Sequence, residues 1–293
     1  MAAALLVLEG CTGDPFFRDP SGEPIGAVMR TTVPLAYAAS VAMASVSGSS
    51  PSNALATNTC SSFPCAAVVT ILADGRAAPL PAESYGSGQI VVAGLWTSPG
   101  TAILTAVFVD LFVGNALLQV KNVSTFPAVV TSTGLRVVYA SIDVNIESGP
   151  VDPVTLTPEQ IDALFMKVSI TPSSSPGANV GLNAWVVDVD DAGTPNDFSD
   201  DRYTVNGGGE YVDASADSGQ VLQLGIVGMT ADPSCALNPV EGFAALDDTG
   251  VSTASLPVLA TALFVFEPEC TGQARVVLAT GNYLLSIGKM ISL

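Results

Sequence analysis

The chain has 293 residues, of which 48% are hydrophobic and only 12% are charged. Its 27 acidic residues against 9 basic ones give a formal net charge of -18, which would repel a phosphate backbone and an anionic membrane surface, so nucleic-acid binding is excluded as a function. Histidine is absent, which excludes Ser-His-Asp and Cys-His catalysis and every histidine-ligated metal centre.

The chain begins with an apolar segment, MAAALLVLEGC, that ends at Cys11. Its last four residues, LEGC, resemble the lipobox of bacterial lipoproteins, which has a leucine three residues before the lipidated cysteine and a small residue directly before it. The resemblance implies a leader at 1–11, a lipid on Cys11 and export, and Thr12 is similar to the pattern of lipoproteins sent to the outer membrane. No hydrophobic run reaches the roughly 18–20 residues of a spanning helix, so the lipid would be the membrane contact. The alternative is an ordinary first strand with a buried Cys11.

The segment VPLAYAASVAMAS at 33–45 alternates larger and smaller side chains, which predicts a β-strand. The larger side chains on one face of this strand are Val33, Leu35, Tyr37, Val41 and Met43. The other face consists mainly of alanine and serine, which allow another surface to approach closely. That surface is either a loop or second sheet of the same chain, or a neighbouring subunit.

Five cysteines are present, and setting Cys11 aside leaves the even number that a disulfide framework in an exported protein requires. Cys60 and Cys65 lie close together in the short segment NTCSSFPC and would form a local disulfide. Cys235 and Cys270 would then close a longer loop in the second half, which chain-entropy estimates value at roughly 3–4 kcal/mol. The alternative is four reduced, buried thiols.

Short β-branched runs between Gly, Pro, Asn and Asp turns fill most of the chain, which predicts an all-β protein. Examples are AAVVTILADG, GQIVVAGLW, GLRVVYASIDVNI and ATALFVFEPE. One short helix is expected over TLTPEQIDALFM at 155–166, where Thr157 is the candidate N-cap and Pro158 lies in the first turn. It follows the segment ESGPVDP at 147–153, which we interpret as a domain linker.

The second half contains KVSITPSSSPGANVGLNAWVVDVDDAGTPNDF, which resembles bacterial immunoglobulin-like domains of the invasin and adhesin type. In that family a strand, a Pro/Ser turn, a second strand and an acidic turn open the sandwich. The first half has a comparable rhythm in AAVVTILADGRAAPLPAE and the strand-like runs that follow it. The resemblance implies two immunoglobulin-like antiparallel β-sandwich domains, at 12–150 and 151–293, and the role of an extracellular scaffold or binding module.

The segment DVDDAGTPNDFSDDR holds six aspartates within fourteen residues, at a strand end and in the loop after it. They are Asp188, Asp190, Asp191, Asp197, Asp200 and Asp201. Ca²⁺ takes six to eight oxygen ligands and is bound by carboxylate-rich loops of this kind. Because so many like charges repel each other without a counter-ion, the segment is a candidate Ca²⁺ site. The alternative is a set of solvated acidic turns, since the spacing departs from the EF-hand pattern.

With no histidine, catalysis would have to depend on carboxylates alone. We therefore expect a non-enzymatic structural or adhesive protein, anchored at the outer membrane or cell surface through Cys11. It would associate with itself or with other envelope proteins, including as a fibre or surface layer. The alternatives are a virion structural protein and a carboxylate-dependent hydrolase, which would need a cleft with two acids about 5–10 Å apart and at least one raised pKa.

Overall fold

The structure is a computed structural model, and its described residues leave several gaps. They are 23–49, 51–72, 88–109, 111–113, 116–123, 126–148, 178–213, 220–235, 238–248, 260–280 and 283–292. The leader at 1–11 with Cys11, the helix expected over 155–166 and most of the linker at 147–153 lie outside these residues.

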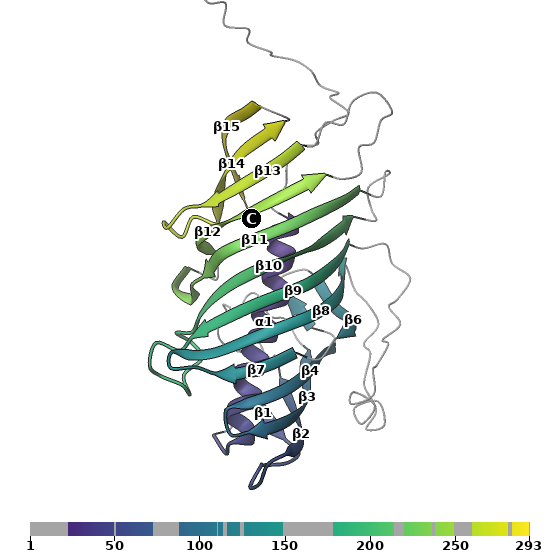
Figure 1. Cartoon of the computed structure of the whole chain (residues 1–293), viewed down its shortest axis with the longest axis vertical. Coiled ribbons are helices and arrows are strands. Elements are labelled where there is room, and N and C mark those ends of the chain that lie inside the picture. The colour runs from purple at the N-terminus through teal and green to yellow at the C-terminus, as the bar shows by residue number, and fades with distance from the viewer. Residues whose placement is uncertain are drawn as a thin grey trace, which may run out of the picture.

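One long helix, α1 (Glu23–Val46), is present where we expected a strand over 33–45 (Figure 1). Every side chain that the structure describes between Ile25 and Val46 is buried or half-buried. A mostly apolar helix without an exposed polar face is typical of one enclosed in a core, and alanine, which recurs along α1, is the best helix former. The strand prediction is therefore wrong, because alternation in side-chain size was interpreted as a two-residue period. Among the described residues, no helix has the length and hydropathy needed to cross a membrane.

Helix α1 ends in a hydrogen-bonded turn that requires glycine. The backbone N–H of Gly48 donates to the carbonyl of Ser45 at 3.2 Å, and the N–H of Ser49 donates to the carbonyl of Ala44 at 3.0 Å. These two bonds pair the carbonyls left free at a helix C-terminus, and they place Gly48 in the left-handed region with a φ of 95°. Glycine adopts this conformation without steric cost, so the helix stops there.

In the part of the chain that the structure describes, the other regular elements are fifteen strands and one short 3₁₀ turn. Their bounds are β1 (Ala54–Ala56), β2 (Cys65–Leu72), β3 (Gln89–Ser98), β4 (Thr101–Val109), β5 (Leu111–Val113), β6 (Ala116–Val123), β7 (Phe126–Val130), β8 (Gly134–Ser148), β9 (Ala178–Asp190), β10 (Arg202–Asp213), β11 (Gln220–Ala231), η2 (Pro233–Cys235), β12 (Pro239–Asp248), β13 (Ala260–Phe266), β14 (Gln273–Thr280) and β15 (Tyr283–Ser292).

The strands form one antiparallel sheet in which most neighbours along the chain are also neighbours in space. The path runs from β1 through β4, continues with β7, and then follows chain order to β15, while β5 and β6 form a hairpin that pairs with the second half of β8. Strands β8 and β9, on either side of the expected domain boundary at 150, pair from Gly134 opposite Asp190 to Ile146 opposite Ala178. The mostly antiparallel β-structure is confirmed. Two separate immunoglobulin-like sandwiches are not, because strands of both expected domains belong to one sheet.

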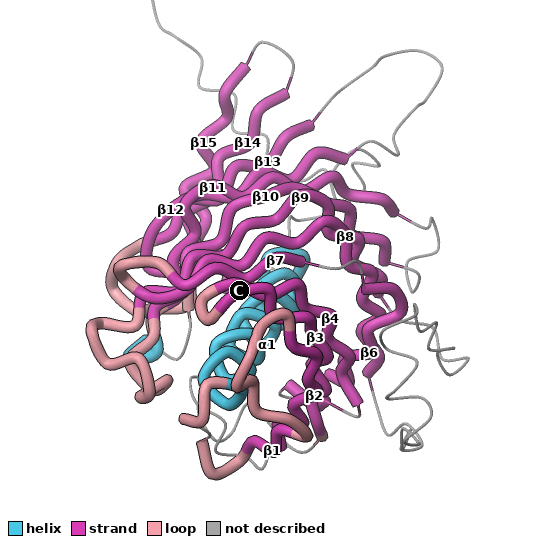
Figure 2. The backbone as a smooth tube through the Cα atoms, turned by 60° about the horizontal axis from the view of Figure 1, so that its bottom comes forward, coloured by secondary structure: helices cyan, strands magenta, loops and turns pink. Residues whose placement is uncertain are grey.

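The sheet curves around α1, which lies on its concave side (Figure 2). Helix α1 contacts β1 to β4 and β8 to β10. One row of fully buried side chains crosses five neighbouring strands and belongs to the same core as the helix: Ala128, Val137, Val187, Val205 and Met229. Each large aliphatic side chain buried in this way contributes about 1.5–3 kcal/mol, so the helix and the concave face form the main core.

A β-bulge makes room for one of the largest buried side chains, Trp185 on β9. The pairing of β9 with β10 shifts register between Asn206 and Gly208, which leaves Gly207 at the bulge with a φ of 156°. A Cβ atom at Gly207 would lie 2.5 Å from Cδ2 of the Trp185 indole. The absence of a side chain at Gly207 therefore lets the tryptophan ring lie flat against β10.

We predict that Gly207→Ala lowers the free energy of unfolding by about 1–3 kcal/mol, because the added methyl group overpacks against Trp185. Urea unfolding followed by tryptophan fluorescence measures the change. Gly225→Ala on β11 is the matched control, since a Cβ there meets nothing within 4 Å. Equal losses in both variants would contradict the packing explanation.

Candidate functional site

Both predicted disulfides are present. Cys60 and Cys65 have Cα atoms 5.7 Å apart, and their disulfide closes the segment between β1 and β2. The backbone N–H of Cys60 also donates to the carbonyl of Val46, at the end of α1, at 3.2 Å. Cys235 in η2 is joined to Cys270, between β13 and β14, with Cα atoms 4.8 Å apart. Disulfides form and persist in oxidising compartments, so the two bonds point to an extracytoplasmic protein.

The six aspartates of the candidate calcium site lie around the connection between β9 and β10. Asp188 and Asp190 belong to the end of β9, and Asp201 directly precedes β10. Among the described residues, no three His, Cys, Asp or Glu side chains are grouped closely enough to hold a metal ion. Calcium binding stays a prediction from the sequence.

Asp188 and Asp200 each have both carboxylate oxygens engaged by one side-chain donor. Asp188 accepts from Nε of Arg136 at 2.6 Å and from its second terminal nitrogen at 3.1 Å, in a bidentate ion pair on the outer face of the sheet. The hydroxyl group of Thr194 lies 2.9 and 2.8 Å from the two oxygens of Asp200. Both aspartates therefore have a structural partner within the chain.

Three further aspartates close turns of the loop. Asp190, Asp191 and Asp197 each accept a hydrogen bond from the backbone N–H two residues later, at 3.1, 2.9 and 3.0 Å. Such turns are a common use of aspartate. Asp197 also accepts from the hydroxyl of Ser199 at 2.5 Å, and these bonds hold its pKa below the usual value. This part of the acidic segment acts as a set of solvated turns.

Asp201 differs from the other five aspartates because it is buried, with only 2% of its surface exposed. Its Oδ2 atom accepts from the hydroxyl of Tyr203 at a long 3.4 Å. Burial and the negative charges of Asp200, Asp191 and Asp197 raise the pKa of Asp201 to about 7. Asp201 therefore changes its protonation state near neutral pH.

Phe198 attaches the loop to the core. Its ring is buried and meets the ring of Tyr37 on α1 edge to face, with the centroids 5.8 Å apart. An aromatic residue between acidic neighbours is the one signal in the sequence that this loop folds back onto apolar structure.

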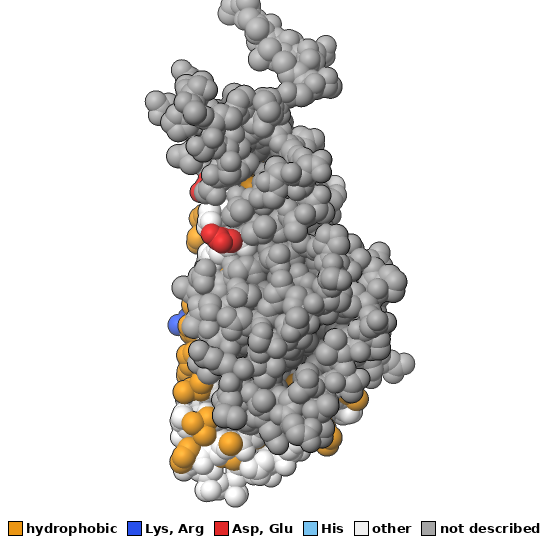
Figure 3. All heavy atoms as spheres, turned by 90° about the vertical axis from the view of Figure 1, so that its right-hand side faces the viewer, with side chains coloured by type: hydrophobic (Ala, Val, Ile, Leu, Met, Phe, Trp, Pro, Cys, Tyr) orange, Lys and Arg blue, Asp and Glu red, His pale blue; other side chains and the backbone are white. Residues whose placement is uncertain are grey.

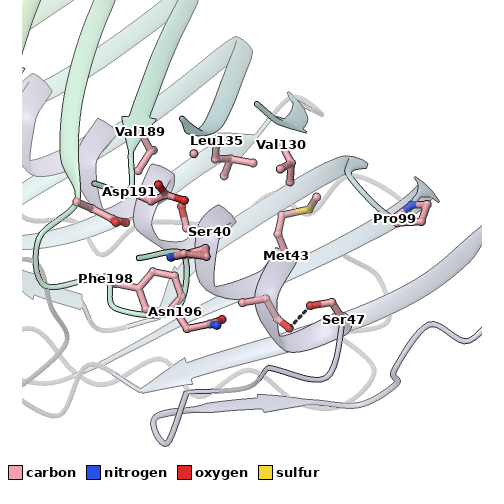
Figure 4. A pocket seen from close by; sticks show the side chains of 14 residues that line it. Ser40, Met43, Ser47, Pro99, Val130, Leu135, Val189, Asp191, Asn196 and Phe198 are labelled. Carbon is pink, nitrogen blue, oxygen red and sulfur yellow. Dashed lines mark hydrogen bonds between the residues drawn. The ribbon is translucent and has the colours of Figure 1, made fainter. Parts of the chain in front are cut away.

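A pocket of about 190 Å³ lies between the C-terminal half of α1, the turn between β7 and β8, and the acidic loop (Figure 4). Its apolar wall consists of Met43, Val130, Leu135 and Val189. Its polar lining includes Ser40, Asp191, Asn196 and Asp201. In Figure 4 Ser40, Asp191 and Asn196 gather on one side of the view, together with the apolar Val189 and Phe198, and Met43 and Val130 lie on the other side. We call the part of the pocket near Ser40 and Asp191 its polar end.

Ser40 contributes an unsatisfied group to this pocket. Its Oγ atom is shielded from solvent and has no hydrogen-bond partner among the described residues. Buried hydroxyl groups normally find a partner, so a group that lacks one next to a cavity is a candidate contact for a ligand. Sequence reasoning missed Ser40 because it assigned this segment to a strand.

The outer face of the sheet carries exposed apolar side chains in register. Val227, Phe243 and Val265 lie side by side on β11, β12 and β13 and are 50%, 45% and 40% exposed; we call them the first apolar row. They point away from the core, since Ile226, Ala244 and Phe264, one residue along each strand, are buried.

A second apolar row lies on β3, β4 and β7, where Leu95, Ile103 and Pro127 are neighbours and exposed. Figure 3 shows hydrophobic side chains along the left edge and at the base of the molecule, with few charged ones visible between them. At these two rows the outer face departs from the polar pattern of a sheet that meets water.

Comparison with known proteins finds no matching family model, no matching curated protein and no matching solved structure. The lipobox and immunoglobulin-like resemblances stay expectations from the sequence. The proposals below depend on the chain's own geometry.

We predict that Asp201→Asn stabilises the protein at pH 8 and leaves it little changed near pH 4. The folded state keeps the Asp201 proton up to about pH 7, whereas the unfolded chain releases it near pH 4. The free energy of unfolding of the wild type therefore falls as pH rises from about 4 to about 7, and this contribution is constant above pH 7. The difference between variant and wild type should grow to at most about 4 kcal/mol at pH 8.

Urea unfolding at pH 4, 6 and 8 measures this difference. Asp190→Asn removes an exposed carboxyl group from the same segment and should show no comparable trend. A difference for Asp201→Asn that is constant from pH 4 to 8 would contradict the buried titration.

Proposed function

We propose that the chain is a non-enzymatic structural or adhesive protein of the cell envelope, which associates with further copies of itself through the outer face of its sheet. The disulfides favour export, and the lipid predicted on Cys11 would hold the protein at the outer membrane. The observation that carries the proposal is the pair of apolar rows on the outer face.

The apolar rows support contact with another surface because the concave face already has its partner. Helix α1 and its neighbours fill that side, so Val227, Phe243 and Val265 are not needed for the core described above. Exposed apolar side chains that adjoin across several strands mark interaction surfaces more often than scattered ones do.

A second copy of the chain fits this face better than a membrane or a charged partner does. The basic groups near the rows are already paired, since Arg136 binds Asp188 and Arg275 binds Glu267 at 3.0 Å. An anionic membrane is disfavoured by the net charge of -18. Two such faces in contact would bury the apolar side chains of the rows against each other.

A carboxylate-dependent hydrolase is the alternative that one observation favours. Asp191 and Asp201 line the same pocket, and the pKa of Asp201 is raised. However, 190 Å³ is below the roughly 300–1,000 Å³ typical of small-molecule pockets and leaves little room for a glycan or peptide chain. The size of the pocket therefore favours the non-enzymatic proposal.

We predict that Phe243→Lys weakens self-association by at least about tenfold, because it would place an unpaired charge in an apolar contact. Sedimentation velocity over a wide range of protein concentration measures this. A lysine lowers the net negative charge, so added repulsion between copies would not explain the loss. Thr59→Lys, at an exposed residue between β1 and β2, is the control and should associate like the wild type. A wild-type protein that stays monomeric throughout would contradict the proposal.

We predict that the protein from its native source has the mass of a chain beginning at Cys11, with acyl groups added and the hydrogens of two disulfides lost. Intact-mass spectrometry before and after reduction measures leader cleavage, acylation and thiol oxidation together. The mass of an untrimmed, fully reduced chain would overturn both the lipid anchor and export.

A further inference from the structure

The pocket beside the acidic loop carries negative charge and has no basic side chain among the described residues that line it. The groups that act on the Asp201 carboxyl are Asp200, Asp191, Asp197 and the hydroxyl of Tyr203. No basic side chain among the described residues is one of them. A buried carboxyl group with three acidic neighbours favours a positive charge in the adjoining cavity.

The polar end of the pocket also offers an acceptor that is not in use. Ser40 Oγ is shielded, has no partner among the described residues and lines the same cavity as Asp191 and Asp201. An ammonium group has three N–H donors and no acceptor, so it suits a site made of two carboxyl groups and a hydroxyl oxygen.

Most of the remaining lining is apolar, and the volume of the pocket limits the size of the ligand. The apolar wall faces the cavity from α1, β7, β8 and β9, and the Phe198 ring adds an aromatic surface of the kind that attracts organic cations. A cavity of about 150 Å³ can hold benzene, so 190 Å³ fits a ligand of about six to eight non-hydrogen atoms. A hydrated divalent metal ion would gain nothing from this wall, and no three acidic side chains described here are grouped to ligate one.

We propose that this pocket binds a small organic monocation, an ammonium group that carries a short apolar chain. The ammonium group donates hydrogen bonds to Asp201, Asp191 and Ser40 Oγ, and the apolar chain lies against the apolar wall. This binding is independent of self-association, because the first and second apolar rows lie on the opposite face of the sheet.

Titration calorimetry with n-pentylammonium chloride and 1-pentanol tests the proposal on the full chain at pH 8. The two probes have the same number of non-hydrogen atoms and differ in charge. We expect one pentylammonium ion per chain and an affinity at least about tenfold higher than that of pentanol, because only the ammonium group forms charge-assisted bonds. Equal affinities, or no binding of pentylammonium, would overturn the proposal.

The pH dependence identifies the carboxyl group involved. With an Asp201 pKa of about 7, the affinity for pentylammonium should rise about tenfold from pH 6 to pH 8, as the fraction of chains with the ionised carboxylate grows. Binding at pH 7 should release about half a proton, which is measured as a heat that differs between phosphate and HEPES buffers. An affinity that is independent of pH would overturn the assignment to Asp201.

Three variants separate the site from the general negative field. Asp201→Asn should lower the affinity at least about tenfold and remove its pH dependence, and Ser40→Ala should lower it about fivefold through one lost hydrogen bond. Asp190→Asn removes the same charge from an exposed residue that does not line the pocket, and it should bind like the wild type. Equal losses of affinity in Asp190→Asn and Asp201→Asn would overturn the proposal. Displacement of bound pentylammonium by calcium ions at a concentration below that of pentylammonium would overturn it as well.

Discussion

The burial of a largely apolar helix on all its described sides is the constraint from which the rest of this structure follows. Between Ile25 and Val46 the described side chains of α1 leave no exposed polar face, so the helix needs cover around its circumference. A flat sheet covers only one side of a helix, whereas a curved sheet encloses it. The sheet meets this requirement through its curvature and its long central strands β8 to β11.

The enclosure also explains where the pocket lies. The acidic loop returns to the helix through Phe198 and Tyr37, yet its backbone must pass over the C-terminal half of α1 with turns built from Asp190, Asp191 and Asp197. The cavity beside these turns is lined by apolar side chains and by Asp191 and Asp201, and Asp201, the residue directly before β10, is buried.

Local patterns in the sequence were sufficient for some of these features and insufficient for others. The disulfides followed from parity and spacing, and the strands followed from turn residues that separate β-branched runs. Alternation from Val33 to Met43 failed as a signal, because a helix buried on every side has no polar stripe that would reveal its period. The pocket could not be predicted, because Ser40 and Asp201 are brought together by the fold and share no motif. A single continuous sheet was missed for the same reason, since pairing of β8 with β9 spans the segment that resembled a linker.

The order of elements along the chain has a consequence for biosynthesis. Helix α1 precedes all the described strands, and β10, one of those that contact it, ends at Asp213. Chains emerge from the ribosome N-terminus first, so the helix is made long before its cover is complete. A nascent or truncated chain that stops short of β10 thus exposes the hydrophobic side chains of this helix. Chaperones and quality-control proteases recognise exposed hydrophobic segments of this kind.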